Sequence, residues 1–577
     1  MAEGYLQISA GDVSKTLNSA IEKSLRLRLL PRIMNRDAGL FTRSAKLHSL
    51  IGNRLGWVDV TRKMSRQVGQ IERFGKKVMD DGLFHFVLMG MGGSSLCPEV
   101  FGRLFGKHKR LRSYSIVDST DPAAIRSVLN KIELDHTLFV VASKSGGTIE
   151  TRSHEAFFLE RLRGVGVSNP GRHFAAVTDR GSSLEKFARR NRYRKLFLNP
   201  PDIGGRYSAL SYFGLVPAFF AGVDLRKLLE GARSMEEILR ERPDESNPGL
   251  QLAAWMFACA ARGRDKMTFV PTERTRPVVP WIEQLVAEST GKQGRGIVPV
   301  EGEPTGPARR YGKDRAMIVI RHARERFPLS ATTVRDLARE KVPMAEIVLG
   351  DKHQVGGQFL LWEAATAAVG RLLGVNPFDE PNVTESKNNT GVILREFEVL
   401  GEHSPGEPVA AWGRLSLLAM GGKVRYDRRD LLKLDSLLKR ILRAIRPPKY
   451  VALLSYFKSD RNTEKAADSL RDVIRSGTGA TVLRGYGPRY LHSIGQLYKG
   501  GPSNGVFFVL VRQKYGRMPI PGKNYNFGQL IAAQAIGDTQ ALMGRGLPTM
   551  LIALDGSPAA GIRALTQAAA RALKNKG

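Results

Sequence analysis

An apolar run that passes directly into a short hydroxyl-rich loop constrains this chain most. Residues 137–142 (TLFVVA) form the run, which is typical of a buried parallel strand. The loop at 143–148 (SKSGGT) follows, and its two glycines let backbone N–H groups approach a ligand closely. The next residues can begin a helix, which adds unpaired donors and a positive dipole end. This arrangement indicates a phosphate-binding loop, and the alternative is an ordinary strand–turn–helix junction with a serine cap.

A second loop of the same kind lies upstream. The apolar run at 85–89 leads into residues 90–96 (GMGGSSL). A dinucleotide fingerprint needs a third glycine, which is absent, and Asp118 is the nearest acidic residue to the ribose-binding position. Gly291-Lys292 is not a P-loop, because Gln293 stands where Ser or Thr should coordinate magnesium. Two such loops in one parallel sheet predict a sugar phosphate held at the carboxyl ends of the strands.

The alternation of strands and helices defines the fold class. Strands predicted at 84–89, 114–117, 137–142 and 173–177, with helices between them, indicate a doubly wound parallel α/β sheet. A second α/β unit begins near 266–270, and a third follows Pro447-Pro448. A length of 577 residues accommodates several domains. We therefore predict four parts: a helical N-terminal segment (1–80), a first α/β domain (81–225), a second (226–400) and a C-terminal α/β region (401–577).

The chain is strongly basic, with 89 Lys and Arg against 55 Asp and Glu and a formal net charge of +34. Such a field attracts anionic sugar phosphates, and it also favours sequence-independent contact with nucleic acid. The basic residues are spread along the chain; the densest run is at 189–195 (RRNRYRK). The sequence carries no helix-turn-helix, zinc-finger or RNA-binding signature, so it does not indicate specific nucleic-acid binding.

Cysteine usage and hydropathy point to the cytoplasm. Cys97 and Cys259 are the only cysteines, too few for a disulfide framework or a zinc cluster. No apolar run reaches the roughly 18 residues that would suggest a membrane helix. The first four residues, MAEG, begin no secretory signal. We expect a cytoplasmic protein that makes no membrane contact.

Three residues are candidates for reaction chemistry. Arg206 follows two glycines on a predicted tight loop, where its permanently charged guanidinium could bind a phosphate or an oxyanion through two donors. The alternative is a surface arginine after a turn, which the apolar surroundings disfavour. Glu288 lies on a predicted helix three residues after Leu285, near a buried face that would raise its pKa toward that of a general base. Most helix glutamates are solvated. His492 could serve as an acid–base group, but a lone histidine is more often structural.

Several separated segments together resemble one family, the glucose-6-phosphate isomerases, which are built from sugar isomerase domains. Besides the two glycine–serine loops, the segments are 204–211 (GGRYSALS), 287–292 (AESTGK), 376–387 (NPFDEPNVTESK) and 492–496 (HSIGQ). The histidine segment follows the lysine helix, an order that resembles the isomerase half of bacterial transaldolase–isomerase fusion proteins. The resemblance covers nearly all of residues 30–575. It implies two sugar-isomerase domains, and it implies that any transaldolase activity must come from a separate chain.

The resemblance implies interconversion of glucose 6-phosphate and fructose 6-phosphate, with no cofactor and no metal. His492, aided by Lys387, would open the sugar ring. Glu288 would carry a proton from C2 to C1 through a cis-enediol(ate), and Arg206 would stabilise its negative charge. It further implies a homodimer, and it leaves open whether His492 acts in its own subunit. The substrate contacts implied for the phosphate are Ser94, Ser143, Lys144, Ser145 and Thr148, and those for the rest of the substrate are Gly93 and Gly205.

One departure from the family pattern is plain: Glu380 stands where the family has glutamine. A carboxylate cannot donate to phosphate and repels it at close range. Glu380 therefore points elsewhere, is offset by basic neighbours, or reduces phosphate affinity. Two other functions stay open from the sequence. One is a non-catalytic sugar-phosphate-binding or nucleic-acid-associated protein, and the other is an isomerase of another sugar phosphate, such as mannose 6-phosphate.

Overall fold

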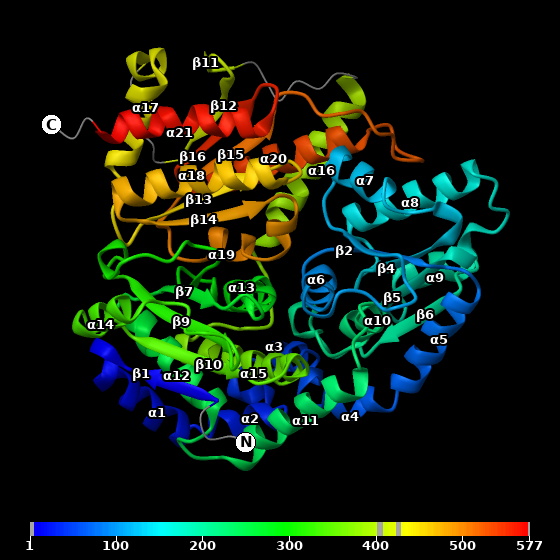
Figure 1. Cartoon of the computed structure of the whole chain (residues 1–577), viewed down its shortest axis with the longest axis horizontal. Coiled ribbons are helices and arrows are strands. Elements are labelled where there is room, and N and C mark those ends of the chain that lie inside the picture. Colours follow the sequence, from blue (N-terminus) through cyan, green and yellow to red (C-terminus); the bar gives the residue numbers. More distant parts are fainter. Residues whose placement is uncertain (1–4, 401–407, 423–427, 575–577) are drawn as a thin grey trace.

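The computed structural model describes residues 5–400, 408–422 and 428–574, and it holds three β-sheets with helices packed around them (Figure 1). The first sheet has five parallel strands in the order β3-β2-β4-β5-β6. Its central strands are fully buried, which explains why continuous apolar runs predicted them. The predicted α/β fold is confirmed. The strands are β2 (His85–Gly90), β3 (Ser113–Val117), β4 (Thr137–Ala142), β5 (Phe174–Asp179) and β6 (Lys195–Asn199).

The second sheet has the order β1-β10-β9-β7-β8, and it is parallel except for β1 at its edge. Strand β1 belongs to the segment 1–80, which we expected to be helical and which otherwise is, from α1 (Ser14–Arg26) to α5 (Val68–Asp80). A four-residue strand carries too little pattern to be recognised without its partner. The strands are β1 (Leu6–Ser9), β7 (Lys266–Pro271), β8 (Val298–Val300), β9 (Arg315–His322) and β10 (Met344–Leu349).

The third sheet lies at the top of Figure 1 and has six strands in the order β11-β12-β16-β15-β13-β14. Its last four strands are parallel, as predicted, whereas the hairpin β11–β12 was not predicted. The expected domain boundary at 400/401 falls beside residues 401–407, which are outside the described part of the chain. The strands are β11 (Ala410–Trp412), β12 (Leu415–Gly421), β13 (Tyr450–Ser455), β14 (Thr481–Tyr486), β15 (Gly505–Arg512) and β16 (Thr549–Leu554).

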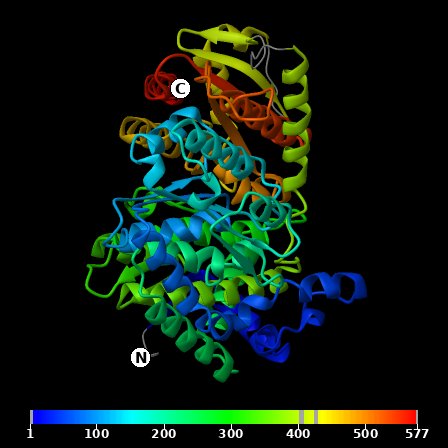
Figure 2. The ribbon, with the colours of Figure 1, turned by 90° about the vertical axis from the view of Figure 1, so that its right-hand side faces the viewer.

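Helix α16 (Val383–Leu400) connects the second and third units. It is the long upright helix in Figure 2, and it packs on α20 (Phe527–Gly544) of the third unit. Ser386 Oγ donates to Asp538 Oδ1 at 3.0 Å across this contact. The helix that carries Lys387 is therefore fixed to the C-terminal region rather than to the sheet that precedes it in sequence.

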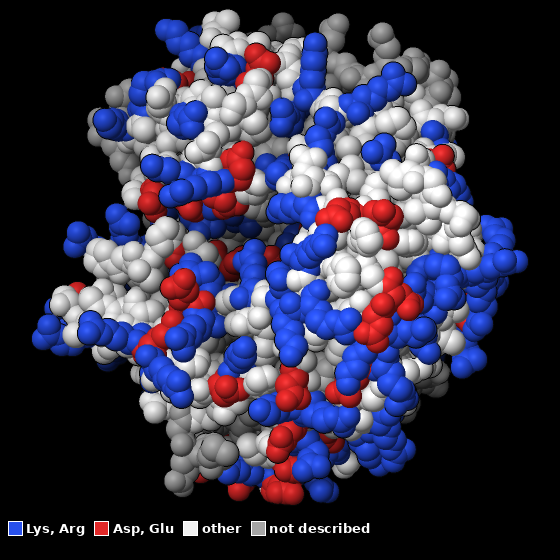
Figure 3. Space-filling view, turned by 45° about the vertical axis from the view of Figure 1, so that its right-hand side comes forward, with Lys and Arg blue, Asp and Glu red and all other residues white. Residues whose placement is uncertain are grey.

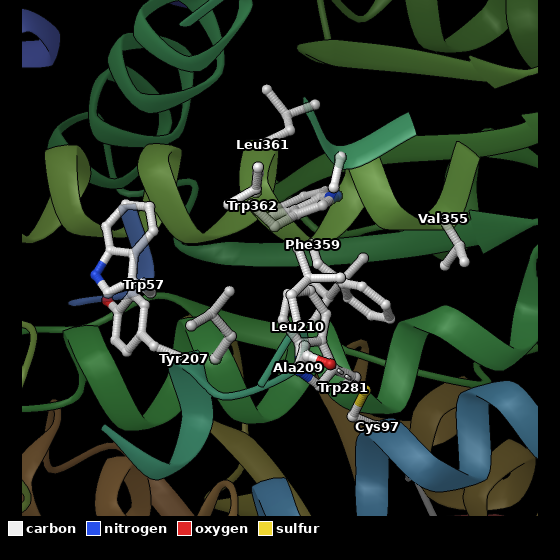
Figure 4. Packing of buried hydrophobic residues seen from close by; sticks show 14 of the residues in the cluster. Trp57, Cys97, Tyr207, Ala209, Leu210, Trp281, Val355, Phe359, Leu361 and Trp362 are labelled. Atoms are coloured by element: carbon white, nitrogen blue, oxygen red, sulfur yellow. Dashed lines mark hydrogen bonds between the residues drawn. The ribbon is translucent and has the colours of Figure 1, made fainter. Parts of the chain in front are cut away.

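Two aromatic contacts in the largest core anchor the elements that carry Arg206 and Glu288 (Figure 4). Tyr207 stacks on Trp57 with ring centroids 5.5 Å apart, which holds the short helix η6 (Gly205–Tyr207). Trp281 meets Phe359 of α15 (Val355–Leu373) edge-on at 4.7 Å, which holds α13 (Val279–Thr290). Such pairs add to the stabilisation from burial itself, so both elements have a rigid base.

Basic and acidic side chains are interspersed over the visible face of the molecule (Figure 3). Within the densest basic run, Arg189 pairs with Glu185 at 2.8 Å and Arg194 contacts Asp81. This partial neutralisation favours a solvated basic face over a dedicated nucleic-acid surface. Among the residues described, no helix combines the length and the apolar character needed to cross a bilayer.

Candidate active site

Three distant parts of the chain meet around one cavity of about 240 Å³. The loop after β4 contributes Ser145 and Thr148, α16 contributes Lys387, and the C-terminal region contributes His492. The first residues of α8 (Ile149–Gly164) also face the cavity, so its backbone donors and dipole act there. The cavity therefore combines an anion-binding loop, an ammonium and an imidazole.

The loop at 143–148 holds its shape through its own hydroxyls. Ser143 is buried, and its Oγ lies 3.1 Å from Thr148 Oγ1 and accepts from the Gly146 N–H at 3.1 Å. Gly146 has φ +74°, and a Cβ there would lie 2.4 Å from the Leu184 backbone nitrogen, so only glycine fits. Among the predicted phosphate ligands, Ser145 and Thr148 thus line the cavity, whereas Ser143 shapes the loop behind it.

The side chain of Lys144, which was predicted to contact the phosphate, is bound to other groups of the protein. Its Nζ lies 2.5 Å from Asp179 Oδ2 and donates to the Pro201 carbonyl at 3.3 Å, and it does not line the cavity. Its backbone N–H remains part of the loop, but its side chain is directed toward the end of β5. The predicted phosphate contact of Lys144 stays a prediction.

The first glycine–serine loop packs against two other parts of the site. A Cβ on Gly93, the first residue of α6 (Gly93–Phe105), would lie 2.1 Å from the Gly205 carbonyl oxygen. A Cβ on Gly92, which has φ +56°, would lie 2.7 Å from the His492 carbonyl oxygen. The absence of side chains at these positions lets the Arg206 loop and the His492 segment approach. Ser94, the second residue of α6, is half-buried at the same junction.

His492 is paired with a carboxylate that the sequence analysis did not single out. Its Nε2 lies 3.0 Å from Glu150 Oε1, which also accepts from Gln534 Nε2 at 2.7 Å. Burial pushes the pKa of Glu150 upward, but the nearby His492, with a smaller effect from Lys387, outweighs it and holds that pKa below its usual value. An ionised Glu150 orients the imidazole of His492.

Glu288 and His492 are joined through one amide, that of Gln284. Gln284 Nε2 donates to Glu288 Oε2 at 3.1 Å and to the His492 carbonyl at 2.8 Å. Glu288 does not line the 240 Å³ cavity itself, but this amide links it to a residue that does. Burial raises the pKa of Glu288, Arg206 opposes that rise, and Glu380 adds to it. A carboxylate with a raised pKa suits a general base.

Arg206 is almost completely buried, with 4 % of its side chain exposed. Its Nη1 lies 3.2 Å from Glu288 Oε1, and its Nε donates to Ser289 Oγ at 2.8 Å. Its Nη2 donates to the carbonyls of Pro377 and Asp379 at 2.7 and 2.9 Å. The guanidinium is therefore fixed beside the carboxylate of Glu288, where it can stabilise negative charge that develops nearby.

The carboxylate of Glu380 also contacts Arg206, at 3.1 Å from Nη1. Of the consequences expected for this departure from the family pattern, the structure favours offset by a basic neighbour. Glu380 is not among the residues that line the cavity beside the phosphate loop.

The predicted reactive residues thus lie together in one chain, since His492 reaches Glu150 and Gln284 of its own chain. Sequence reasoning missed Glu150, Gln284 and Gln534. Gln284 stands four residues before Glu288, a helical spacing that puts both on one face and could have revealed it. Glu150 follows the phosphate loop directly, but nothing local links it to His492.

Parts of the chain are similar to known proteins. A family model described as phosphoglucose isomerase matches residues 57–303. A glucose-6-phosphate isomerase of Acaryochloris marina is 29 % identical over 339 residues, which cover 52 % of this chain and 64 % of the relative. A probable glucose-6-phosphate isomerase of Methanococcus maripaludis is 27 % identical over 390 residues, covering 61 % and 87 %. The chain thus spans just under two thirds of the length of the Acaryochloris marina relative.

A solved structure shares the fold. The crystal structure of a glucose-6-phosphate isomerase from Chlamydia trachomatis superposes with a TM-score of 0.52 at 18 % identity, covering 68 % of this chain and 86 % of that one. The chain thus has the α/β fold of that structure. The match to the phosphoglucose isomerase family model is confined to residues 57–303, which are less than half of the chain.

Proposed function

We propose that this chain is an aldose–ketose isomerase that interconverts glucose 6-phosphate and fructose 6-phosphate. One observation carries the proposal: the Gln284 amide joins the Glu288 carboxylate to the His492 segment, next to a cavity that a phosphate loop borders. The names of the relatives support the same reaction.

The loop at 143–148 and the start of α8 would hold the phosphate. Backbone N–H groups, the hydroxyls of Ser145 and Thr148 and the helix dipole supply donors and positive potential. Ser94 and the glycines Gly93 and Gly205 would complete the contacts from the junction of α6 with η6. The net charge of +34 would speed the arrival of an anionic substrate.

His492 would open the ring. Its imidazole, oriented by Glu150, gives a proton to the ring oxygen O5 and takes up the proton of the C1 hydroxyl, so that the C1–O5 bond breaks, C1 becomes an aldehyde and the imidazole is restored. Lys387, which also lines the cavity, would bind the same oxygen atoms.

Glu288 would then carry out the isomerisation. Its carboxylate removes the proton from C2, the electrons of that bond form the C1–C2 double bond, and the C1 oxygen becomes the enediolate oxygen. Glu288 returns the proton to C1 and the O2 proton passes to the C1 oxygen, which leaves a hydroxyl at C1 and a ketone at C2. Arg206, held beside Glu288, would stabilise the negative charge between the two steps.

A coupled assay tests the proposal with the purified chain. The wild type should interconvert the two hexose phosphates, and Glu288→Gln should lose about 10³-fold in kcat because the base is gone. Circular dichroism should show the same fold for both. A folded wild type without turnover would defeat the proposal.

Two other functions are distinguishable. A sugar-phosphate sensor or a nucleic-acid-associated protein is favoured by the net charge alone, and it would show salt-dependent nucleic-acid binding without turnover. An isomerase of another sugar phosphate would prefer a different C2 configuration, which parallel assays with mannose 6-phosphate would reveal. The linked Glu288 and His492 favour catalysis over a sensor.

The setting of the enzyme also belongs to the proposal. We infer a cytoplasmic homodimer, with a separate chain supplying transaldolase activity where that is needed. Light scattering of the purified chain would test the dimer, and cell fractionation would test the location.

A further inference from the structure

One nitrogen of Arg206 is shared by two carboxylates. Nη1 lies 3.2 Å from Glu288 Oε1 and 3.1 Å from Glu380 Oε2. Glu380 comes from the segment between α15 and α16, far in sequence from both partners. We propose that Glu380 is a positioning residue of the reaction, which holds Arg206 and makes Glu288 a stronger base than Arg206 alone would allow. The inference rests on the proposed isomerase function.

The charges around Glu288 support this role. Burial, the largest effect, and the charge of Glu380 raise the pKa of Glu288, while Arg206 and, more weakly, Lys292 and the Gln284 amide lower it. Tyr207 also faces Glu288, and burial raises its pKa, so its hydroxyl stays neutral. Glu380 therefore adds negative charge to this set, in contact with the same nitrogen of Arg206 as Glu288.

The neighbouring acid, Asp379, has its own cation. Lys292 Nζ lies 2.7 Å from Asp379 Oδ1, and Asn376 Nδ2 donates to Asp379 Oδ2 at 2.9 Å. Two adjacent carboxylates thus have separate tasks: Asp379 is neutralised by Lys292, and Glu380 shares Arg206 with Glu288. A neutral glutamine at 380 could hold the guanidinium less strongly and would leave its full positive charge on Glu288.

About half of the Glu380 side chain is exposed (52 %), so its effect on Glu288 is screened by salt. This gives the proposal a second, independent signature. A purely structural role of Glu380 would change stability or KM, but it would not move a proton equilibrium in a salt-dependent way.

The test is the pH profile of kcat/KM for Glu380→Gln, at about 20 mM and about 500 mM salt, where charges are screened over very different lengths. Glu385→Gln is the matched control, because Glu385 is partly exposed like Glu380, lies five residues further on and pairs with Arg545 instead. The acid limb of Glu380→Gln should move to lower pH by about 0.5 unit or more at low salt. At a pH on that limb, its rate relative to its own plateau should rise about threefold.

The limb should shift less at high salt, and Glu385→Gln should keep the wild-type profile. An unmoved limb in an active Glu380→Gln overturns the inference while the proposed function stands. A fall in KM without any shift also overturns it, and assigns Glu380 to phosphate repulsion instead. A wild type that is folded but inactive defeats the proposed function, and the role of Glu380 falls with it.

Discussion

The imidazole Nε2 of His492 lies 3.0 Å from Oε1 of Glu150, a residue 342 positions earlier in the chain. Glu150 stands at the start of α8 in the first α/β unit, and His492 ends η11 (Arg489–His492) in the last. The contact brings the end of the phosphate loop and the histidine segment to one wall of the cavity, and Gln534 from α20 secures it.

Glu150→Gln should lose about 10²-fold in kcat/KM, because a neutral amide cannot supply the charge-assisted hydrogen bond that orients the imidazole. The coupled assay with glucose 6-phosphate measures this. Glu160→Gln on the exposed side of the same helix removes the same charge and should stay near the wild type. Activity of Glu150→Gln within a factor of two of the wild type would show that His492 works without this carboxylate.

Glu288→Gln should be more stable than the wild type at pH 7.5, although the proposed function predicts that this variant loses activity. The folded state raises the pKa of Glu288, chiefly by burial. Above the unfolded pKa of about 4.3, the unfolded chain releases this proton more readily, so ionised Glu288 costs folding free energy as the pH rises. Melting temperatures from pH 4 to 8 should therefore show a gain for Glu288→Gln that shrinks toward pH 4. A constant difference across that range would contradict the raised pKa.

Arg206→Lys should reduce kcat by about 10²-fold with a smaller effect on KM, because the phosphate loop remains while the forked donors are lost. It should also cost about 1–3 kcal/mol in the free energy of unfolding, since buried acceptors such as Ser289 Oγ and the Pro377 carbonyl lose their donor. Steady-state kinetics and urea unfolding measure the two effects. Arg112→Lys, an exposed arginine paired with Glu133, is the control and should change neither. A changed KM with an unchanged kcat would place Arg206 outside the chemical step.

Asp538→Asn should cost about 3–5 kcal/mol in the free energy of unfolding. Asp538 is fully buried, lies 2.7 Å from Lys499 Nζ and accepts hydrogen bonds from Ser386 and Tyr490. Its loss leaves a buried ammonium without a counter-charge.

The double variant Lys499→Met/Asp538→Asn should recover part of that stability, because it removes both charges. Asp555→Asn, at an exposed position, should have little effect. If the midpoint of urea unfolding were the same for Asp538→Asn and the wild type, Asp538 would not stabilise the contact of α16 with the C-terminal region.

Much of the fold was predictable because its central strands are buried on both faces. The strands predicted at 84–89 and 137–142 correspond to β2 and β4. The short or edge strands β1, β8 and β11 were missed, since their existence depends on partners remote in sequence.

The site was predictable where the type of a residue limits what it can do chemically. It was less predictable where the role of a residue depends on its partner in the folded chain. Arg206, Glu288 and His492 could be proposed from their chemistry and from a family pattern, and the structure places them in one linked set. The pairing of His492 with Glu150 depends on how the first and third sheets are arranged, whereas that of Lys144 with Asp179 depends on β4 lying beside β5. No local spacing encodes that arrangement.

The Gln284 amide has a mechanical consequence. One –NH2 group touches both the carboxylate of α13 and the main chain of the histidine segment, so a shift of the C-terminal region relative to α13 would misalign both at once. Ring opening and proton transfer, chemically separate events, would then be switched on or off together. In the proposed isomerase, a ligand that displaces residues 487–501 would therefore stop ring opening and proton transfer together, and no open-chain sugar would accumulate.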